Sequence, residues 1–210
     1  MGLSSKRIDW WEPQVGEEER ELLLQVLDSN FLNDGEYTTR FEQMLGNLLG
    51  CKHVVAVTNG TSALFLALAG SGIGPGDEVI VPAFTYIASV NAIRYVGAEP
   101  VFVDSDPATW NVTVDLIEDA ITAKTKAIML VAANGRAPRA GIEAFQKLCD
   151  ERGLLLIEDA AQGLGSYYPD GAHTGTKGLV GSFSFSAPKI ISTGQGGALV
   201  TDDDCVAERL

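Results

Sequence analysis

The hydrophobic pattern of the chain alternates between two periods from residue 53 onward. Short apolar runs, typical of buried strands, alternate with segments whose apolar residues recur every three or four positions, typical of amphipathic helices. The sequence predicts strands at His53–Val57, Glu78–Val81, Glu99–Val103, Lys126–Ala132, Leu154–Ile157, Gly181–Phe185 and Ala198–Thr201. It predicts helices at Ala63–Ala69, Tyr86–Tyr95, Leu116–Ile121 and Gly141–Glu151. This alternation predicts right-handed βαβ crossovers, and therefore an α/β fold: a three-layer α/β/α arrangement with a mainly parallel sheet.

Both ends of the chain are predicted to be helical. Residues 1–50 carry two helical patterns, Glu17–Ser29 and Thr38–Leu49, and form an N-terminal helical segment ahead of a large domain at residues 51–210. The last residues, Asp202–Leu210, begin an amphipathic helix that is capped by Asp and shows no stop signal. We therefore expect the chain to be a fragment of a longer protein.

Composition and charge narrow the classes of function. The 210 residues are 46% hydrophobic, which excludes wholesale disorder, and 15 Lys and Arg against 28 Asp and Glu give a net charge of −13. A nucleic-acid partner is excluded because phosphate binding needs clustered basic residues. No apolar run approaches the roughly 18 residues of a membrane span. The opening MGLSSKRIDWWEP lacks the apolar region of a signal peptide, so we expect a cytoplasmic protein with no membrane partner.

Cysteine and histidine exclude two further kinds of site. Cys51, Cys149 and Cys205 are far apart in the sequence and form no CxxC motif, which is typical of reduced thiols in a cytoplasm. His53 and His173 cannot complete a Cys/His zinc site at any usual spacing, so no metal site is predicted. A Ser-His-Asp hydrolase is also disfavoured, because the sequence has no GxSxG motif.

The predicted strand ends carry residues suited to a ligand, because ligands of parallel sheets bind where the strands end. Gly60, Thr61 and Ser62 follow the first strand and offer N–H and hydroxyl groups at a helix start, which predicts a phosphate cradle; plain helix capping is the alternative. An aromatic residue in the segment Phe84–Tyr86, after the second strand, is suited to stack on a planar ligand, or else packs in the core.

Two charged residues complete the set of candidates. The apolar strand Leu154–Ile157 delivers Asp159 to the sheet edge, where a buried carboxylate needs a cation, unless it only caps a helix. Lys189 lies in a turn between two strand patterns, where a partly desolvated amine becomes a nucleophile; a solvated surface lysine is the alternative. A phosphate cradle, a stacking aromatic, a strand-end Asp and a turn Lys are together what pyridoxal 5'-phosphate (PLP) requires.

At these residues the chain resembles the nucleotide-sugar aminotransferases of the DegT/StrS type, which are fold type I PLP enzymes. The resemblance spans essentially all 210 residues and extends to perosamine-synthase-like 4-aminotransferases. Its motifs are TNGTSALFLAL, GDEVIVPAFTYIASVNAI, EPVFVD, IEDAAQGLGS and GSFSFSAPKIISTGQGGALVTDD, together with TTRFEQML near the start. The resemblance implies the large domain of that fold, a homodimer, and a smaller C-terminal domain that has no counterpart in these 210 residues.

The resemblance also implies a role for each matching residue. Lys189 matches the lysine that forms a Schiff base with the cofactor, and Asp159 matches the partner of the pyridinium nitrogen. Gln162 matches the residue beside the 3-hydroxyl, and Tyr86 matches the stacking aromatic. The phosphate contacts match Gly60, Thr61, Ser62 and Ser184.

The expected reaction moves an amino group, usually from glutamate, to a nucleotide-linked keto sugar, with Lys189 as general base. Relatives with His at the lysine position are dehydratases, and Lys189 argues against that branch. One departure affects substrate contacts: the family commonly has a His and an aromatic before a Gly where this chain has Ala132-Ala133-Asn134-Gly135. A truncated or regulatory non-catalytic paralogue is the alternative function, and these residues alone are expected to show little turnover. A dinucleotide-binding dehydrogenase would need GxGxxG, which TNGTSA is not.

Overall fold

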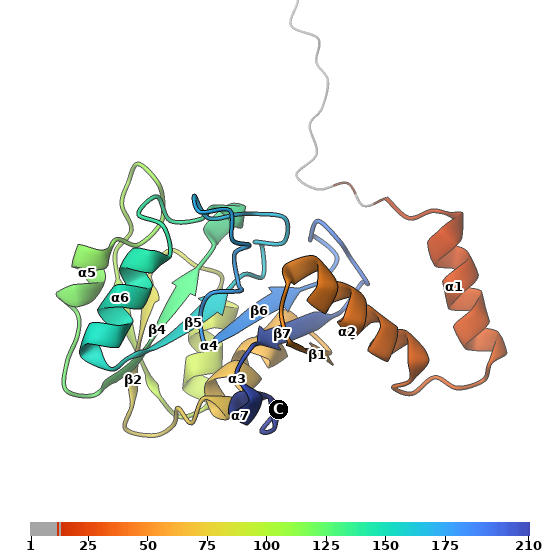
Figure 1. The fold of residues 1–210 in the computed structure, drawn as a ribbon, viewed down its shortest axis with the longest axis horizontal. Coiled ribbons are helices and arrows are strands. Elements are labelled where there is room, and N and C mark those ends of the chain that lie inside the picture. Colours follow the sequence, from red (N-terminus) through yellow and green to blue (C-terminus); the bar gives the residue numbers. More distant parts are fainter. Residues whose placement is uncertain (1–11, 13) are drawn as a thin grey trace, which may run out of the picture.

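A seven-stranded sheet forms the centre of the computed structural model, which describes residue 12 and residues 14–210 (Figure 1). The strands are β1 (His53–Val57), β2 (Glu78–Pro82), β3 (Glu99–Val103), β4 (Thr125–Val131), β5 (Leu155–Asp159), β6 (Val180–Ser184) and β7 (Gly197–Thr201). Their order in the sheet is β1-β7-β6-β5-β4-β2-β3. Strand β7 is antiparallel to both of its neighbours and the other pairs are parallel, which confirms the predicted, mainly parallel sheet.

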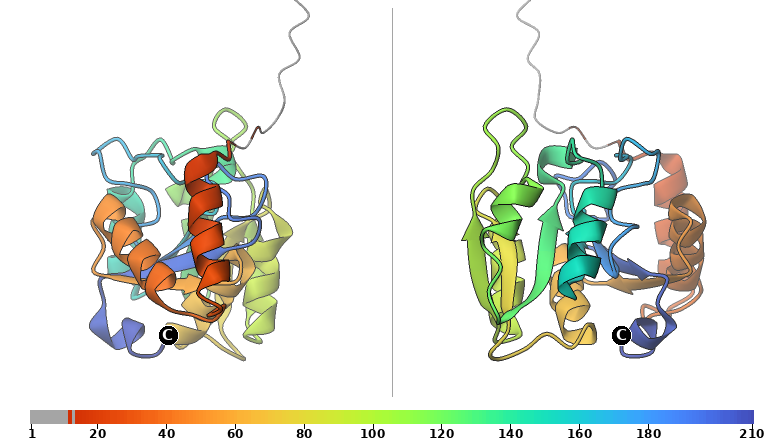
Figure 2. Two further views of the ribbon diagram at one scale, coloured as in Figure 1. Left: turned by 90° about the vertical axis from the view of Figure 1, so that its right-hand side faces the viewer. Right: turned by 60° about the vertical axis from the view of Figure 1, so that its left-hand side comes forward.

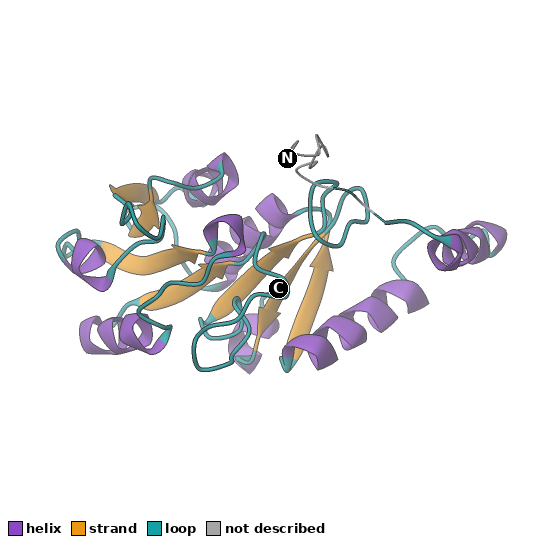
Figure 3. Ribbon diagram, turned by 90° about the horizontal axis from the view of Figure 1, so that it is seen from above, coloured by secondary structure: helices purple, strands orange, loops and turns teal. Residues whose placement is uncertain are grey.

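Helices cover both faces of the sheet (Figures 2 and 3). They are α1 (Glu17–Asp28), α2 (Glu36–Leu49), α3 (Gly60–Gly70), α4 (Ile87–Tyr95), α5 (Val114–Glu118), α6 (Glu143–Arg152) and α7 (Asp204–Ala207), with a short 3-10 turn η1 (Ala133–Gly135). One face packs on α3, α4 and α7, and the opposite face packs on α5, α6 and α2. The predicted three-layer α/β/α fold is therefore confirmed.

Strand β4 shows why the sheet needs helices on both sides. Ala127 and Met129 point into the core beneath α3 and α4, whereas Ile128 and Leu130 point into the core beneath α5 and α6. Successive side chains of a strand point to opposite faces, so a strand that is apolar at every position is stable only between two covering layers.

Helix α1 differs from the other helices because none of its residues is buried. It lies apart from the sheet, beyond α2 (Figure 1). A hydrogen bond of 2.8 Å from the Tyr37 hydroxyl to Oε1 of Gln25 links it to α2. Among the helices that the structure describes, none combines the length and the apolar character needed to cross a membrane.

Several predicted helix boundaries were wrong. Helix α3 begins three residues before the predicted Ala63, and α6 begins two residues after the predicted Gly141. Local capping accounts for the differences at three other helices. Helix α2 begins at Glu36, directly after the extended Gly35, and not at Thr38. Helix α5 spans Val114–Glu118, and not Leu116–Ile121, because the Thr113 side chain accepts a hydrogen bond from the N–H of Leu116. Helix α7 has the predicted Asp cap but ends at Ala207, with Glu208 as its C-cap, so it does not run on to the last residue.

Candidate functional site

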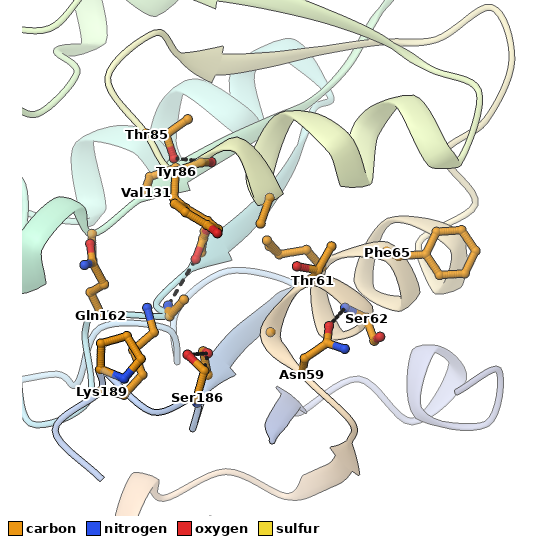
Figure 4. Close-up of a pocket in the computed structure, with 18 of the residues that line it drawn as sticks. Asn59, Thr61, Ser62, Phe65, Thr85, Tyr86, Val131, Gln162, Ser186 and Lys189 are labelled. Atoms are coloured by element: carbon orange, nitrogen blue, oxygen red, sulfur yellow. Dashed lines mark hydrogen bonds between the residues drawn. The ribbon is translucent and has the colours of Figure 1, made fainter. Parts of the chain in front are cut away.

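A pocket of about 650 Å³ opens at the carboxyl ends of the strands. Its lining comes from the segments that follow β1 and β2, from the ends of β4, β5 and β6, and from the turn before β7. Lys189 and Gln162 lie on the opposite side of the pocket from the start of α3, as Figure 4 shows. The structure brings all eight predicted site residues to this one pocket: Gly60, Thr61, Ser62, Tyr86, Asp159, Gln162, Ser184 and Lys189.

The start of α3 is shaped to receive an anion. The Asn59 side chain caps the helix by accepting a hydrogen bond of 2.8 Å from the N–H of Ser62, so the cap is Asn59 and not one of the two hydroxyl residues. A Cβ on Gly60 would lie 2.8 Å from Cβ of Ser184, so only glycine allows the helix to start this close to β6. The positive end of the helix dipole and the Thr61 and Ser62 side chains therefore face the pocket.

Asp159 places a buried carboxylate at the pocket floor. It is the last residue of β5, and its side chain is 5% exposed. Oδ2 accepts a hydrogen bond of 2.6 Å from the Ser89 hydroxyl, and Oδ1 accepts one of 3.0 Å from the N–H of Ala161. Burial raises the pKa of Asp159, while these two hydrogen bonds and the charge of Lys189 oppose the rise. Such a carboxylate favours a cationic ligand group.

Glu158, the neighbour of Asp159 on β5, is equally buried, but its hydrogen bonds serve to hold a loop in place. Its carboxylate accepts hydrogen bonds from the Tyr168 hydroxyl and from the N–H groups of Gly175, Lys177 and Gly178. These bonds hold the loop that follows β5 against the sheet. Adjacent residues of a strand face opposite ways, so of the two carboxylates only that of Asp159 lines the pocket.

Ser89 is a site-supporting residue that sequence reasoning missed. It lies in the first turn of α4, is fully buried, and shares a second hydrogen bond of 2.7 Å with the Thr85 hydroxyl. A buried hydroxyl within an apolar helical stretch is the only sequence signal, and it does not reveal Asp159 as the partner.

We expect Ser89→Ala to lower the free energy of unfolding by about 1.5–3 kcal/mol, the range for hydrogen bonds to charged groups. Ser71→Ala is the matched control, because the hydroxyl of Ser71 donates at 2.7 Å to an uncharged acceptor, the carbonyl oxygen of Ala67. Urea denaturation of both variants measures the difference. Equal losses would show that the Ser89 hydroxyl does not stabilise the carboxylate of Asp159.

Lys189 is half-buried in the turn between β6 and β7. Its N–H donates a hydrogen bond of 3.0 Å to the carbonyl oxygen of Ser186, and the hydrogen bond of 2.8 Å from Phe185 N–H to Gly196 carbonyl closes the base of the turn. Burial lowers the pKa of Lys189, and the carboxylate of Asp159 partly opposes this shift. A lowered pKa makes more of the amine neutral, which is the nucleophilic and basic form.

Tyr86 and Gln162 border the pocket from two loops. Tyr86 is the N-cap residue of α4, and its side chain is 77% exposed. Phe84 lies outside the pocket, with its ring centroid 5.1 Å from that of Trp110. The aromatic residues that line the pocket are Tyr86, Phe65 and Tyr95, and of these Tyr86 belongs to the predicted segment. Oε1 of Gln162 accepts a hydrogen bond of 3.0 Å from the N–H of Asn134, which fixes the Gln162 side chain at the rim.

Comparison with known proteins agrees with this geometry. The model of the DegT/DnrJ/EryC1/StrS aminotransferase family matches residues 13–210. The chain belongs to this family. It is 44% identical to the GDP-perosamine synthase of Escherichia coli O157:H7 over 205 residues, which is 97% of this chain and 56% of that protein. The chain therefore spans about half the length of the curated relatives that it matches.

Solved structures of known proteins are similar to the fold. The X-ray structure of the aminotransferase from Psychrobacter cryohalolentis has a TM-score of 0.90 and 37% identity, and the match covers 95% of this chain and 50% of that one. GDP-4-keto-6-deoxy-D-mannose-3-dehydratase of E. coli, solved with bound hydrated PLP, has a TM-score of 0.88 and 29% identity over 95% of this chain and 50% of that one. Solved structures similar to this fold thus include a dehydratase as well as an aminotransferase.

Proposed function

We propose that the protein is a PLP-dependent aminotransferase that moves an amino group from glutamate to a nucleotide-linked keto sugar. The observation that carries the proposal is one pocket that holds a partly buried lysine amine, a buried carboxylate and the start of a helix. Two relatives that are 42% and 44% identical are named GDP-perosamine synthase, so a GDP-linked 4-keto-6-deoxy sugar is the first substrate to test.

The residues of the pocket fit the cofactor. A volume of about 650 Å³ lies within the range of cofactor pockets, roughly 300–1,000 Å³. The start of α3 and the hydroxyls of Thr61, Ser62 and Ser184 would hold the phosphate. The carboxylate of Asp159 would bind the protonated ring nitrogen, and Tyr86 would cover a ring face. When bound, PLP supplies an electron sink for the bonds at the substrate carbon.

The protein residues supply binding and proton transfer. The carboxylate of Asp159 would keep a proton on the ring nitrogen of the cofactor. Burial favours this arrangement, because the protonated nitrogen gives the buried carboxylate a partner of opposite charge. The neutral amine of Lys189 would hold the cofactor at its aldehyde carbon, with the aldehyde oxygen leaving as water, and would be free to act as a base once a donor amine takes its place. Lys189 then takes the proton from the α-carbon of glutamate. For the keto sugar, Lys189 delivers a proton to the carbon that receives the nitrogen.

The test is glutamate-dependent amination. The full-length product of the gene, loaded with PLP, is incubated with L-glutamate and a panel of nucleotide-linked keto sugars that begins with GDP-4-keto-6-deoxymannose. We expect one amino sugar and an equal amount of 2-oxoglutarate, both detected by mass spectrometry. Lys189→Ala is the control and should form neither. Cofactor binding without conversion of any sugar would contradict the proposal and favour a non-catalytic paralogue.

A further inference from the structure

A second cavity adjoins the main pocket. It has a volume of about 200 Å³ and shares the residues Ala161, Gln162, Ser184, Pro188 and Lys189 with the main pocket. Its remaining lining comes from Asn134, Leu164 and Ile190, none of which lines the main pocket. The side chain of Lys189 therefore borders both spaces, and a group in the smaller cavity lies next to the proposed reacting amine.

Asn134 reaches this cavity from the turn η1 after β4. Its backbone is left-handed, with φ of 53° and ψ of 31°, and Gly135 follows with φ of 74°. Asn adopts this conformation more readily than other residues with a side chain. A Cβ on Gly135 would lie 2.9 Å from the carbonyl oxygen of Gln162, so the turn packs directly on the backbone that carries Gln162.

The hydrogen bond between the two segments determines which atom of Gln162 faces Asn134. A backbone N–H only donates, so the atom 3.0 Å from it must be Oε1 of Gln162, and the Nε2 group keeps its donors for a ligand. Within residues 14–210, the Asn134 side-chain amide makes no hydrogen bond. The cavity is thus bordered by two amide groups and, at Leu164 and Ile190, by apolar side chains.

We propose that Asn134 determines substrate specificity by binding a sugar hydroxyl with its side-chain amide while the keto carbon faces Lys189. The inference rests on the proposed function. An amide both donates and accepts, as a hydroxyl does, and it carries no charge. The amide of Asn134 suits a hydroxyl of a neutral sugar, while Leu164 and Ile190 suit the C–H face or the methyl group of a deoxy sugar. Asn134 is exposed, so its amide exchanges water for the sugar hydroxyl, and a sugar without a hydroxyl at this position gains no such bond and binds less tightly.

The alternative is that Asn134 serves only to form the left-handed turn. Asn134→Gly separates the two roles, because glycine adopts the same backbone conformation without strain and lacks the amide. Asn30→Gly is the matched control: Asn30 is also left-handed, with φ of 55°, and is exposed in the turn after α1. The visible absorbance of bound PLP reports whether each variant keeps the folded site.

The experiment is a calorimetric titration of the PLP-loaded full-length gene product with the keto sugar that the wild type converts, without amino donor so that no turnover occurs. GDP alone, or the matching nucleoside diphosphate, is titrated in parallel. We expect Asn134→Gly to weaken sugar binding by about 3- to 10-fold, the loss of one neutral hydrogen bond. We expect no change for the nucleotide alone, for the PLP spectrum, or for Asn30→Gly with either ligand.

Two results would overturn this inference while leaving the proposed function intact. If Asn134→Gly binds the keto sugar as tightly as the wild type, Asn134 serves the backbone only. If Asn134→Gly loses affinity for the nucleotide and the sugar equally, the turn and not the amide is responsible. A wild-type protein that converts no keto sugar would instead overturn the proposed function, and this inference would fail with it.

Discussion

Lys189→Ala should abolish covalent attachment of PLP and lower turnover by about 10⁴-fold, the upper end of what a positioned acid–base group contributes. Among the described residues that line the pocket, Lys189 supplies the one lysine amine. Its burial gives the amine the lowered pKa that both proposed roles require. Alanine keeps the backbone of the turn, because the bonds that close it are made by main-chain groups.

Borohydride reduction followed by peptide mapping measures this effect directly. In the wild type we expect one cofactor-labelled peptide, the one that contains Lys189. The matched control is Lys177→Ala, because Lys177 is exposed, does not line the pocket, and contacts Glu158 through its backbone N–H. It should keep the label and the activity. A label on Lys177, or on any lysine other than Lys189, would refute the assignment.

Asp159→Asn should lower turnover by about 10²- to 10³-fold, on the scale of a broken buried charge pair. Asparagine has nearly the same shape as Asp159 and keeps both hydrogen bonds. Its carbonyl oxygen accepts from Ala161 N–H, and its amide group donates to the Ser89 hydroxyl oxygen, which is able to accept. The variant loses only the negative charge. The ring nitrogen of PLP then has no carboxylate partner, and the pKa of Lys189 falls further because the opposing charge is gone.

The same substitution should stabilise the cofactor-free protein near neutral pH. Burial raises the pKa of Asp159 in the folded state above its ordinary value of 3.8, so the folded protein binds this proton more tightly than the unfolded chain. The carboxyl group therefore favours folding at low pH, and this contribution is lost as pH rises through the folded pKa. At neutral pH the charged form destabilises the fold by about 1.4 kcal/mol for each pKa unit of the shift.

Urea denaturation of the cofactor-free wild type and Asp159→Asn at several pH values checks this expectation. The variant should be the more stable protein at pH 7, and the difference should shrink as pH falls toward 3.8. Equal stability of the two proteins at pH 7 and at low pH would show that burial of the Asp159 carboxylate does not destabilise the fold. Lower stability of the variant at pH 7 would show that the charge of Asp159 stabilises the fold.

Much of the fold was predictable because hydrophobic periodicity specifies it. Strand β4 is apolar at successive positions, and helices lie between most of the strands, so the three layers follow from the sequence. The site residues were predictable as a group because they follow strand ends, and strand ends meet at one edge of a parallel sheet. Helix boundaries were less certain, since single capping residues such as Gly35 and Thr113 decide them.

Other features depend on contacts that no local pattern encodes. Ser89 reaches Asp159 across 70 positions of sequence. Asn59 takes the cap of α3, a role for which Thr61 and Ser62 were equally suited on local grounds. The second cavity needs β4, β5 and the lysine turn to meet, so the place of Asn134 beside Lys189 emerges only in three dimensions.

The antiparallel strand β7 sets the order in which the site is completed. It lies between β1 and β6 and pairs His53 with Thr201, so β1 has no neighbour in the sheet until β7 has been synthesised. The start of α3, which follows β1, packs against both β6 and β7, and the turn that carries Lys189 joins these two strands. Pairing strands so far apart in the sequence costs chain entropy, and this cost slows folding. While β7 is still to be synthesised, β1 has no strand to pair with, so we expect the cofactor to bind only after β7 has emerged from the ribosome.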